Sequence, residues 1–257
     1  MTRRSDVPPV LAPGEDESTA AYFDDHVPEY STLRLEHAAS YIAEHGGPES
    51  SLIDIGCGVG NTLAFLVERT GVSNVAGLDV SANCLVQTRE QVPCETYQGS
   101  ILDPELVSSL EGRFDFAVLA AVVHHLIGAT RGRSLGFAEA AIHNAVRLVK
   151  PGGHVVVHEP VYSPRAFSAS LFYVKKGVTA ITSKRVELGN QWSNVGPPVV
   201  SYLTNDQLRE FANRAPQAEL AGMWIEPAEP PPIAKLLFRH TDTTVALRRD
   251  PAAAAHR

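Results

Sequence analysis

The sequence predicts an α/β protein with a seven-stranded, mostly parallel, doubly wound sheet whose last strand is antiparallel, and with a helical lid inserted after the fifth strand. Two observations support this fold. Strand-like apolar segments alternate with helical segments from Ser51 to His158, which is typical of a parallel sheet covered by helices on both faces. A glycine-rich turn, Gly56-Cys-Gly-Val-Gly60, joins the first strand to the next helix, where such proteins often bind ligands.

The first half of the chain supplies four of the expected strands. A helical pattern from Ala20 to His45 precedes them and ends at Gly46-Gly-Pro48. Gly71 and Pro93 mark the ends of two later helices, because neither residue continues a helix well. The expected elements are the strands Ser51–Ile55, Val75–Leu78, Glu95–Gln98 and Phe114–Ala120, with the helices Asn61–Arg69, Ser81–Gln91 and Pro104–Leu110 between them.

The second half contains the lid and the remaining strands. Tyr162–Val200 shows no strand pattern, and we interpret this stretch as the helical lid. Thr204 is a suitable N-cap for a helix that runs to Arg214. The other expected elements are a helix over Phe137–Val149, stopped by Pro151-Gly-Gly153, a fifth strand over His154–His158, and two paired strands over Glu219–Ile225 and Thr243–Arg248, joined by a loop around Pro230–Pro232.

We expect one domain over residues 20–257, with the insertion at 162–200, after a disordered leader over residues 1–19. The leader has charge and proline but not the apolar segment of a secretory signal. No apolar run in the chain reaches the roughly 18 residues of a membrane span. Cys57, Cys84 and Cys94 are too few and too irregularly spaced for a disulfide framework or a zinc site. These features predict a cytoplasmic protein without a membrane or metal partner.

The charge balance bears on the kind of partner. The chain has 22 Lys and Arg against 29 Asp and Glu, a formal net charge of −7 at pH 7. This balance gives no basic surface of the kind that binds nucleic acid. We therefore expect a small-molecule substrate and no nucleic acid, and the sequence does not indicate the oligomeric state.

The spacing of the glycines distinguishes between cofactors. Gly56, Gly58 and Gly60 follow the pattern Gly-x-Gly-x-Gly, whereas dinucleotide enzymes use Gly-x-Gly-x-x-Gly to aim a helix N-terminus at a pyrophosphate. Asp79 stands at the end of the second strand, and its two carboxylate oxygens can accept hydrogen bonds from both hydroxyls of a ribose. The combination favours a nucleoside ligand without a pyrophosphate.

Five segments in succession resemble the motifs of class I S-adenosylmethionine (SAM)-dependent methyltransferases. They are LIDIGCGVGN, GLDVS, QGSILD, FDFAVLAAVVHHL and LVKPGGHVVVHEP, in this order over Leu52–Pro160. The segments YFDDHVPEY and YLTNDQLREFANRA resemble other parts of the same family more weakly. The resemblance implies a Rossmann-like enzyme that transfers the methyl group of SAM to an oxygen, nitrogen or carbon of a small molecule. The composition, with an alanine-rich end and few lysines, suggests a natural-product intermediate as the acceptor.

The resemblance also implies roles for particular residues. Asp54 would meet the methionine ammonium of SAM, for which a carboxylate is the natural counter-charge. Ser100 stands where the family more often has Asp, and Asp103 is an alternative to it. The full cofactor set is Asp54, Gly56, Gly58 and Gly60 for the methionine end, Asp79 for the ribose, Val80, Ser100 and Ile101 for the adenine, and Ala120, with Ala121, beside the reacting methyl group.

His124 and His125 are the expected catalytic residues. A neutral imidazole can take the proton that a hydroxyl, amine or carbon acid loses on methylation. The alternative is that they only orient the loop, and His158 and Glu159 are further candidates with the same alternative. The expected acceptor contacts are Tyr22 and Tyr30 in the first helix and Tyr162 and Trp192 in the lid, with core packing as their alternative.

Two other functions are compatible with parts of the pattern. An NAD(P)-dependent oxidoreductase would share the strand, turn and acidic residue, but the glycine spacing and the lack of a Tyr-x-x-x-Lys motif disfavour it. A cyclase that binds SAM without transferring its methyl group is the third hypothesis.

Overall fold

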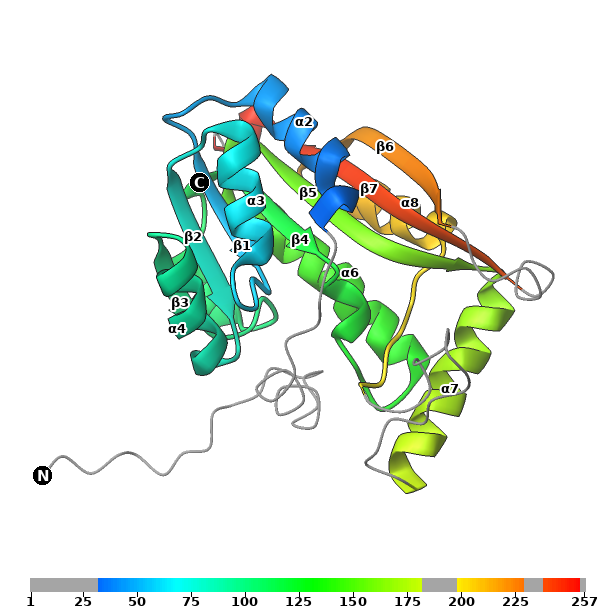
Figure 1. The fold of residues 1–257 in the computed structure, drawn as a ribbon. Helices are drawn as coiled ribbons and strands as arrows, with labels where there is room; N and C mark the ends of the chain where they lie inside the picture. Colours follow the sequence, from blue (N-terminus) through cyan, green and yellow to red (C-terminus); the bar gives the residue numbers. More distant parts are fainter. Residues whose placement is uncertain (1–31, 182–197, 229–237, 255–257) are drawn as a thin grey trace, which may run out of the picture.

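The computed structural model describes residues 32–181, 198–228 and 238–254 of the chain. Within these ranges seven strands form one sheet in the order β3-β2-β1-β4-β5-β7-β6 (Figure 1). All neighbouring strands pair in parallel except β7, which is antiparallel to both β5 and β6. The predicted fold class is therefore confirmed. The strands are β1 (Ser51–Ile55), β2 (Asn74–Asp79), β3 (Glu95–Gln98), β4 (Phe114–Ala120), β5 (Val149–Ser163), β6 (Ala218–Ala228) and β7 (Arg239–Arg249).

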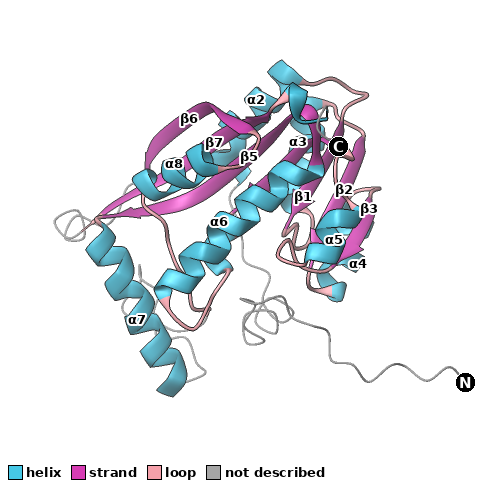
Figure 2. Cartoon of the chain, turned by 180° about the vertical axis from the view of Figure 1, so that it is seen from behind, coloured by secondary structure: helices cyan, strands magenta, loops and turns pink. Residues whose placement is uncertain are grey.

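Helices cover both faces of the sheet. The helices α2, α3 and α4 lie on one face and α5, α6 and α8 on the other, as Figures 1 and 2 show from opposite sides. Helix α7 follows β5 and extends away from the sheet (Figure 1). The bounds are η1 (Thr32–Leu35), α2 (Glu36–His45), α3 (Asn61–Thr70), α4 (Ala82–Gln91), α5 (Pro104–Ser109), η2 (Val123–His125), α6 (Arg131–Leu148), α7 (Arg165–Ile181), α8 (Asn205–Arg214) and η4 (Pro251–Ala254).

The central strands are apolar on both sides because both faces are covered. All five residues of β1 are buried. Successive side chains of a strand point to opposite faces, so two apolar clusters form. One lies under α6 and α8 and contains Ile53, Leu119 and Val157. The other lies under α2 and α3 and contains Leu52, Val118 and Val156. These alternations identify the face to which each neighbouring polar side chain points.

The helix boundaries follow the predicted local signals. Gly71 takes a left-handed φ of +72° just after α3, the conformation that ends many helices. The Ser81 side chain accepts a hydrogen bond from the Cys84 N–H at the start of α4. Thr204 and Gln207 form a reciprocal capping box at the start of α8.

The predicted length of the fifth strand was wrong. Instead of His154–His158, β5 runs from Val149 to Ser163, so Tyr162 is a strand residue and not part of the lid. β4 ends opposite His158, and beyond that point β5 pairs only with β7. Pro160 therefore lies where no β4 ladder continues, and proline is tolerated at such an edge.

Other boundaries also differ from the prediction, as for β6 and β7, which are both longer than expected, or lie outside the described residues. Helix α6 starts at Arg131 rather than Phe137, because Thr130 caps it despite the helix-weakening Gly132 and Gly136. The predicted helix from Ala20 is represented by η1 and α2 in the described residues. Some of the predicted features lie outside the described residues: the leader, Tyr22, Phe23, Tyr30, Trp192 and the loop around Pro230–Pro232.

None of the described helices combines the length and the apolar character needed to cross a membrane.

Candidate functional site

The glycine turn after β1 has the backbone conformation that the sequence predicts. Gly56, Gly58 and Gly60 have φ angles of +71°, +53° and +93°, in the left-handed region that favours glycine. A Cβ atom on Gly56 would lie 2.7 Å from the Val122 side chain, and one on Gly60 would lie 3.1 Å from Thr88. A Cβ on Gly58 would have no atom within 4 Å. The backbone at Gly58 is therefore the part of the turn that borders open space.

Asp79 and the glycine turn meet at the same edge of the sheet. The Gly58 N–H donates to Asp79 Oδ2 at 2.8 Å, and the Ser81 N–H donates to Oδ1 at 2.9 Å. The carboxyl ends of parallel strands lie at one edge, which brings the end of β2 beside the turn that follows β1. The juxtaposition that the sequence analysis requires is present, and two backbone amides orient the carboxylate.

Asp54 supplies a buried carboxylate behind the same turn. It lies in β1 and is only 1% exposed, and its Oδ2 atom has no hydrogen-bond partner among the described residues. Burial raises the pKa of Asp54 well above its usual value, and the charge of Asp79 adds to the effect. An unpartnered buried carboxylate oxygen is costly unless a ligand completes it. A cationic group such as an ammonium fits this position.

Two of the predicted adenine contacts have local partners. The Ser100 hydroxyl is buried and accepts a hydrogen bond from the Leu102 N–H at 3.1 Å. Asp103, the alternative to Ser100, caps α5 through the Glu105 N–H at 2.9 Å. Ile101 is buried in the apolar cluster under α6. Val80 directly follows Asp79 and is partly exposed, so the adenine roles of these residues stay predictions.

The turn after β4 is strained. Ala121 has a φ of +58°, an uncommon conformation for a residue with a side chain. Its N–H donates to the His158 carbonyl oxygen at 2.8 Å, which ties the turn to β5 just beyond Ala120. Backbone strain of about 1–3 kcal/mol is often kept at functional sites. The sequence did not predict this conformation, because alanine carries no signal for it.

Glu159 holds the residues that follow this turn. Its Oε1 atom accepts the Val122 and Val123 N–H groups, both at 2.8 Å, and its Oε2 atom is 2.6 Å from His124 Nδ1. Burial raises the pKa of Glu159 to about 8 and lowers that of His124 to about 3. Near pH 7 the pair is therefore neutral overall. The structure places His124 in a fixed position and gives Glu159 three partners in one turn.

His125 lies beside this pair. Its ring centroid is 4.0 Å from that of His124, and its side chain remains partly exposed. Burial of the ring lowers the pKa of His125 well below 6.5, and the nearby His124 and Lys175 add to this effect. The imidazole is neutral near pH 7, as a proton acceptor requires.

A buried segment around Ser201 and Tyr202, which the sequence did not predict, contacts the residues after β4. The Ser201 N–H donates to the His124 carbonyl oxygen at 2.8 Å. The buried guanidinium of Arg131 donates to Ser201 Oγ at 3.0 Å and to the Tyr202 carbonyl oxygen at 2.7 Å. The Tyr202 ring lies between those of His124, at 5.0 Å, and Tyr162, at 4.4 Å. No motif in this segment indicates these contacts.

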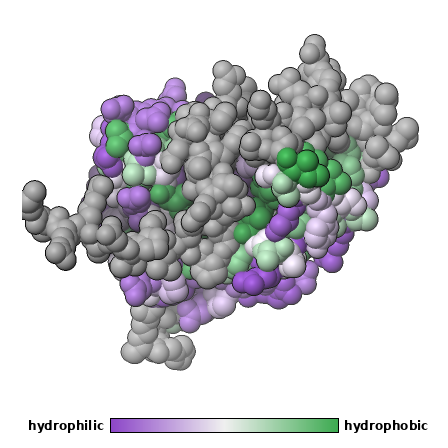
Figure 3. Space-filling view, turned by 90° about the horizontal axis from the view of Figure 1, so that it is seen from below, coloured by the Kyte–Doolittle hydropathy of each residue, from purple (hydrophilic) through white to green (hydrophobic). Residues whose placement is uncertain are grey.

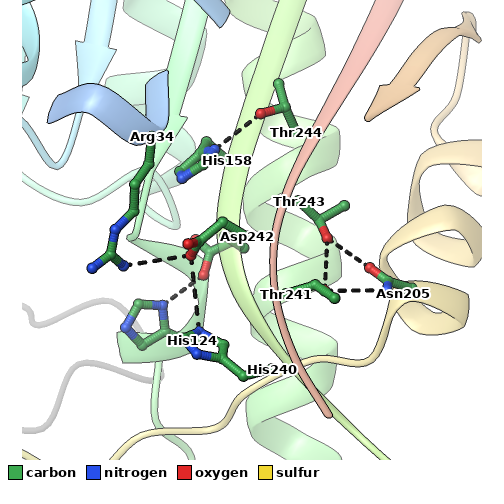
Figure 4. A network of polar contacts seen from close by, with 10 residues as sticks. Arg34, His124, His158, Asn205, His240, Thr241, Asp242, Thr243 and Thr244 are labelled. Atoms are coloured by element: carbon green, nitrogen blue, oxygen red, sulfur yellow. Dashed lines mark hydrogen bonds and ion pairs between the residues drawn. The ribbon is translucent and has the colours of Figure 1, made fainter. Parts of the chain in front are cut away.

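A second polar group lies between η1, β5 and β7 (Figure 4). Arg34 Nη1 is 3.4 Å from Asp242 Oδ1, and His240 Nε2 is 3.9 Å from the same oxygen. His158 Nδ1 is 2.9 Å from Thr244 Oγ1. The Tyr162 ring stacks on His240 with centroids 4.4 Å apart. Tyr162 therefore borders this group, and its contact with an acceptor stays a prediction. Arg34, Asp242 and His240 carry no recognisable sequence signal.

The face seen from below is mixed in character. In Figure 3 apolar residues gather to the right of its centre, and hydrophilic residues lie along its left and lower margins. Within the described ranges, no three His, Cys, Asp or Glu side chains are grouped as a metal site would need.

Comparison with known proteins identifies relatives of the chain. The family described as "Methyltransferase domain" matches residues 27–215. The chain is 32% identical over 139 residues to a ubiquinone biosynthesis O-methyltransferase of Alkalilimnicola ehrlichii, a match that covers 52% of this chain and 51% of that protein. It is 28% identical over 159 residues to a ribosomal RNA small subunit methyltransferase C of Alcanivorax borkumensis, covering 56% and 47%. The chain thus spans about half the length of these curated relatives.

A solved structure shows the same fold over nearly the whole chain. The geranyl diphosphate C-methyltransferase of Streptomyces coelicolor, solved with Mg²⁺, geranyl diphosphate and S-adenosyl-L-homocysteine, superposes with a TM-score of 0.60. The sequence identity is 15%, and the alignment covers 94% of this chain and 100% of that chain. At this identity the likeness concerns the fold alone.

Proposed function

The chain belongs to the methyltransferase domain family, and from this premise we propose that it transfers the methyl group of SAM to a nucleophile on a small molecule. When bound, SAM supplies an electrophilic methyl group on a positively charged sulfur. The protein then has to hold the donor and align the acceptor, which is the contribution that positioning makes to such a reaction.

One observation carries the proposal: the Gly58 amide, the Asp79 carboxylate and the unpartnered Asp54 oxygen lie around the same turn. Asp79 would accept the ribose hydroxyls, and Asp54 would accept the methionine ammonium. The open space beside Gly58 would admit the methionine moiety close to the backbone. Gly56 and Gly60 would shape the turn, Val80, Ser100 and Ile101 would border the adenine, and Ala120 would lie beside the methyl group.

The acceptor side is built from the turn after β4 and the end of β5. His125 would face the acceptor as a neutral imidazole, and His124, held by Glu159, would fix the position of that turn. Tyr162 would form part of the wall. The name of the ubiquinone biosynthesis relative supports oxygen as the methylated atom. The ribosomal RNA relatives point to nucleic acid instead, but the net charge of −7 favours a small molecule, with a natural-product intermediate among the candidates.

Calorimetry and a labelled methyl donor test the proposal. The purified chain is titrated with SAM, S-adenosylhomocysteine and NADH, and we expect binding of the first two only. Incubation with methyl-labelled SAM and a cell extract should then place the label in the small-molecule fraction.

Each alternative gives a different result in the same experiments. Binding of NADH without SAM would favour the oxidoreductase. Label in the RNA fraction would establish a nucleic-acid acceptor. SAM binding with no transfer to any fraction would favour the cyclase.

A further inference from the structure

One face of the sheet presents a row of functional side chains along its carboxyl edge. Asp54, Ala120 and His158 each lie two residues beyond Leu52, Val118 and Val156, which belong to the apolar cluster under α2 and α3. Residues two apart on a strand share a face. Ala120 is also the register partner of His158. His158 is therefore the next side chain after Ala120 on the face to which Asp54 points.

His158 has one ring nitrogen bonded to the protein and one that is available to a ligand. The side chain is 1% exposed, and its Nδ1 atom is 2.9 Å from Thr244 Oγ1. Its Nε2 atom is buried and has no hydrogen-bond partner among the described residues. An imidazole that donates its Nδ1 hydrogen to a hydroxyl has its lone pair on Nε2. In Figure 4 one ring nitrogen of His158 faces Thr244, and the other lies on the side of Arg34.

Burial keeps this ring neutral near pH 7. Burial lowers the pKa of His158 below 6.5, Asp242 and Glu159 oppose that effect, and Arg34 and His37 add to it. A neutral histidine can accept a proton near pH 7, whereas a protonated one cannot.

His124 differs from His158 in its hydrogen-bond partner and in the face of the sheet on which that partner lies. Its Nδ1 atom is already bonded to Glu159, and Glu159 is adjacent to His158 in the strand and so points to the opposite face. The Glu159–His124 pair therefore fixes the turn. Next to Ala120, His158 Nε2 is a buried nitrogen with no hydrogen-bond partner in the part of the chain that the structure describes.

The end of β5 and its neighbours also provide a wall of rings. Tyr162 lies four residues beyond His158, on the same face, and stacks on His240. The rings of Phe167 and Phe238 lie 4.3 Å apart beside it. Planar aromatic walls favour planar acceptors, because ring faces and edges attract one another.

We infer that His158 is a catalytic residue that takes the proton of an acceptor hydroxyl, and that the acceptor is a phenol whose ring lies against Tyr162. This inference rests on the proposed function. A phenol, with a pKa of about 10, loses its proton far more readily than an aliphatic alcohol, which suits a weakly basic histidine. The acceptor O–H breaks and its proton moves to Nε2. The acceptor oxygen bonds to the methyl carbon, whose bond to sulfur breaks with the electron pair left on sulfur.

Pairs of phenols that differ in acidity test this role. A series of hydroxybenzoates and catechols is assayed beside their nitro-substituted analogues, at a pH at which the nitrophenols are ionised and the unsubstituted phenols are not. The nitrophenols then need no base. His158→Asn keeps a polar group near Thr244 but lacks Nε2. We expect it to lower kcat about 10²–10⁴-fold on the unsubstituted phenols and less than tenfold on the nitrophenols, with the calorimetric Kd for SAM unchanged.

Two variants complete the test. His154→Asn is the matched control, because His154 is also buried in β5 on the same face but is bonded to Tyr41, and it should retain activity on both phenol classes. Thr244→Val serves if His158→Asn does not fold, since it leaves the imidazole but removes the partner of Nδ1. We expect the same selective loss on unsubstituted phenols, at about tenfold.

Several outcomes would overturn the inference. Equal losses on both phenol classes would make His158 a structural residue, and retained activity in His158→Asn together with loss in His125→Asn would make His125 the base. Failure of the wild-type chain to methylate any phenol while it binds SAM would reject the acceptor class and leave the proposed function standing. Failure to bind SAM would reject the proposed function itself.

Discussion

The two halves of the candidate site are built in different ways. The half around β1 and β2 consists of backbone groups and carboxylates within short turns, as in the bond from Gly58 to Asp79. The half around β5 and β7 is assembled from separate segments, as in the bond from Ser201 to His124 and the ion pair of Arg34 with Asp242. The first half requires particular backbone conformations, and the second requires particular side chains to meet.

This difference explains what each half can recognise. Left-handed glycines and strand-end carboxylates suit a constant ligand, because few other residues can replace them. Side chains brought together from η1, β5, β7 and the 198–204 segment can be exchanged without altering the sheet. We therefore expect changes in the first half to affect donor binding and changes in the second half to affect the acceptor.

The largest expected effect tests the backbone half. Gly58→Val should reduce the affinity for SAM more than 100-fold, because its side chain would fill the open space where the donor approaches. Gly112→Val is the matched control, since Gly112 also has a left-handed φ, +67°, with no atom within 4 Å of a Cβ. Both variants should lose similar stability in thermal melts, and only Gly58→Val should lose binding in calorimetry. Normal binding by Gly58→Val would contradict the assignment of the turn.

A smaller effect is expected at Asp79. Asp79→Ala should weaken SAM binding by about 1–3 kcal/mol, the scale for lost hydrogen bonds to a charged group, and should leave the KM for the acceptor unchanged. Calorimetry and initial rates measure the two quantities separately. Asp79→Asn, which keeps one acceptor oxygen, should lie between the wild type and Asp79→Ala. An unchanged SAM affinity would reject the ribose role.

The Glu159–His124 pair predicts how stability depends on pH. In the folded chain the pKa of Glu159 is about 8, whereas its usual value is 4.5. Glu159 therefore contributes to the free energy of unfolding. This contribution is complete below pH 4.5 and is lost as the pH rises through 8. The pKa of His124 is shifted in the opposite direction, from 6.5 to about 3. Its contribution to the free energy of unfolding therefore changes with pH only below pH 6.5, where it is lost as the pH falls. Between pH 6.5 and 8 Glu159 alone titrates in this pair, and stability should fall by up to about 2 kcal/mol.

Glu159→Gln isolates that contribution. Denaturant unfolding of the wild type and the variant is compared at pH 6.5 and pH 8, so that all other titrating groups cancel. The curve of the variant should be flatter across this interval. Parallel curves would mean that Glu159 does not carry the extra proton.

The smallest effect tests the acceptor half. Tyr202→Leu removes the ring between His124 and Tyr162, and aromatic pairs contribute about 0.5–1.5 kcal/mol beyond their buried area. We expect the KM for the acceptor to rise about threefold to tenfold while the Kd for SAM stays the same. A loss of SAM affinity in Tyr202→Leu would show that the two halves do not act separately.

The predictability of the site follows the same division. The turn from Gly56 to Gly60 and the position of Asp79 could be predicted, because each depends on a residue type that a strand end or a left-handed turn requires. The pairing of Arg34 with Asp242 could not, because the two residues are separated by 208 positions and meet only when η1 lies against β7. The sequence also presents His124 and His125 as equivalent, whereas in the structure Glu159, from another strand, is bonded to the His124 ring.

Element boundaries show the same limit. The sequence predicts β1 and α8 well because their signals, a short apolar run and an N-cap threonine, lie in or next to the segment itself. The extension of β5 to Ser163 depends on its pairing with β7, a partner far along the chain. Pro160 looks like a strand end in isolation and is tolerated because β4 has already ended.

Val122 connects the two halves of the site. Its side chain packs so closely on the glycine turn that a Cβ on Gly56 would lie 2.7 Å from it, while its backbone N–H is held by Glu159 of β5. A ligand that displaces the glycine turn therefore shifts Val122, and so does a ligand that displaces the end of β5. By thermodynamic reciprocity, any cooperativity in the binding of donor and acceptor that depends on Val122 has the same magnitude in whichever order the two ligands bind.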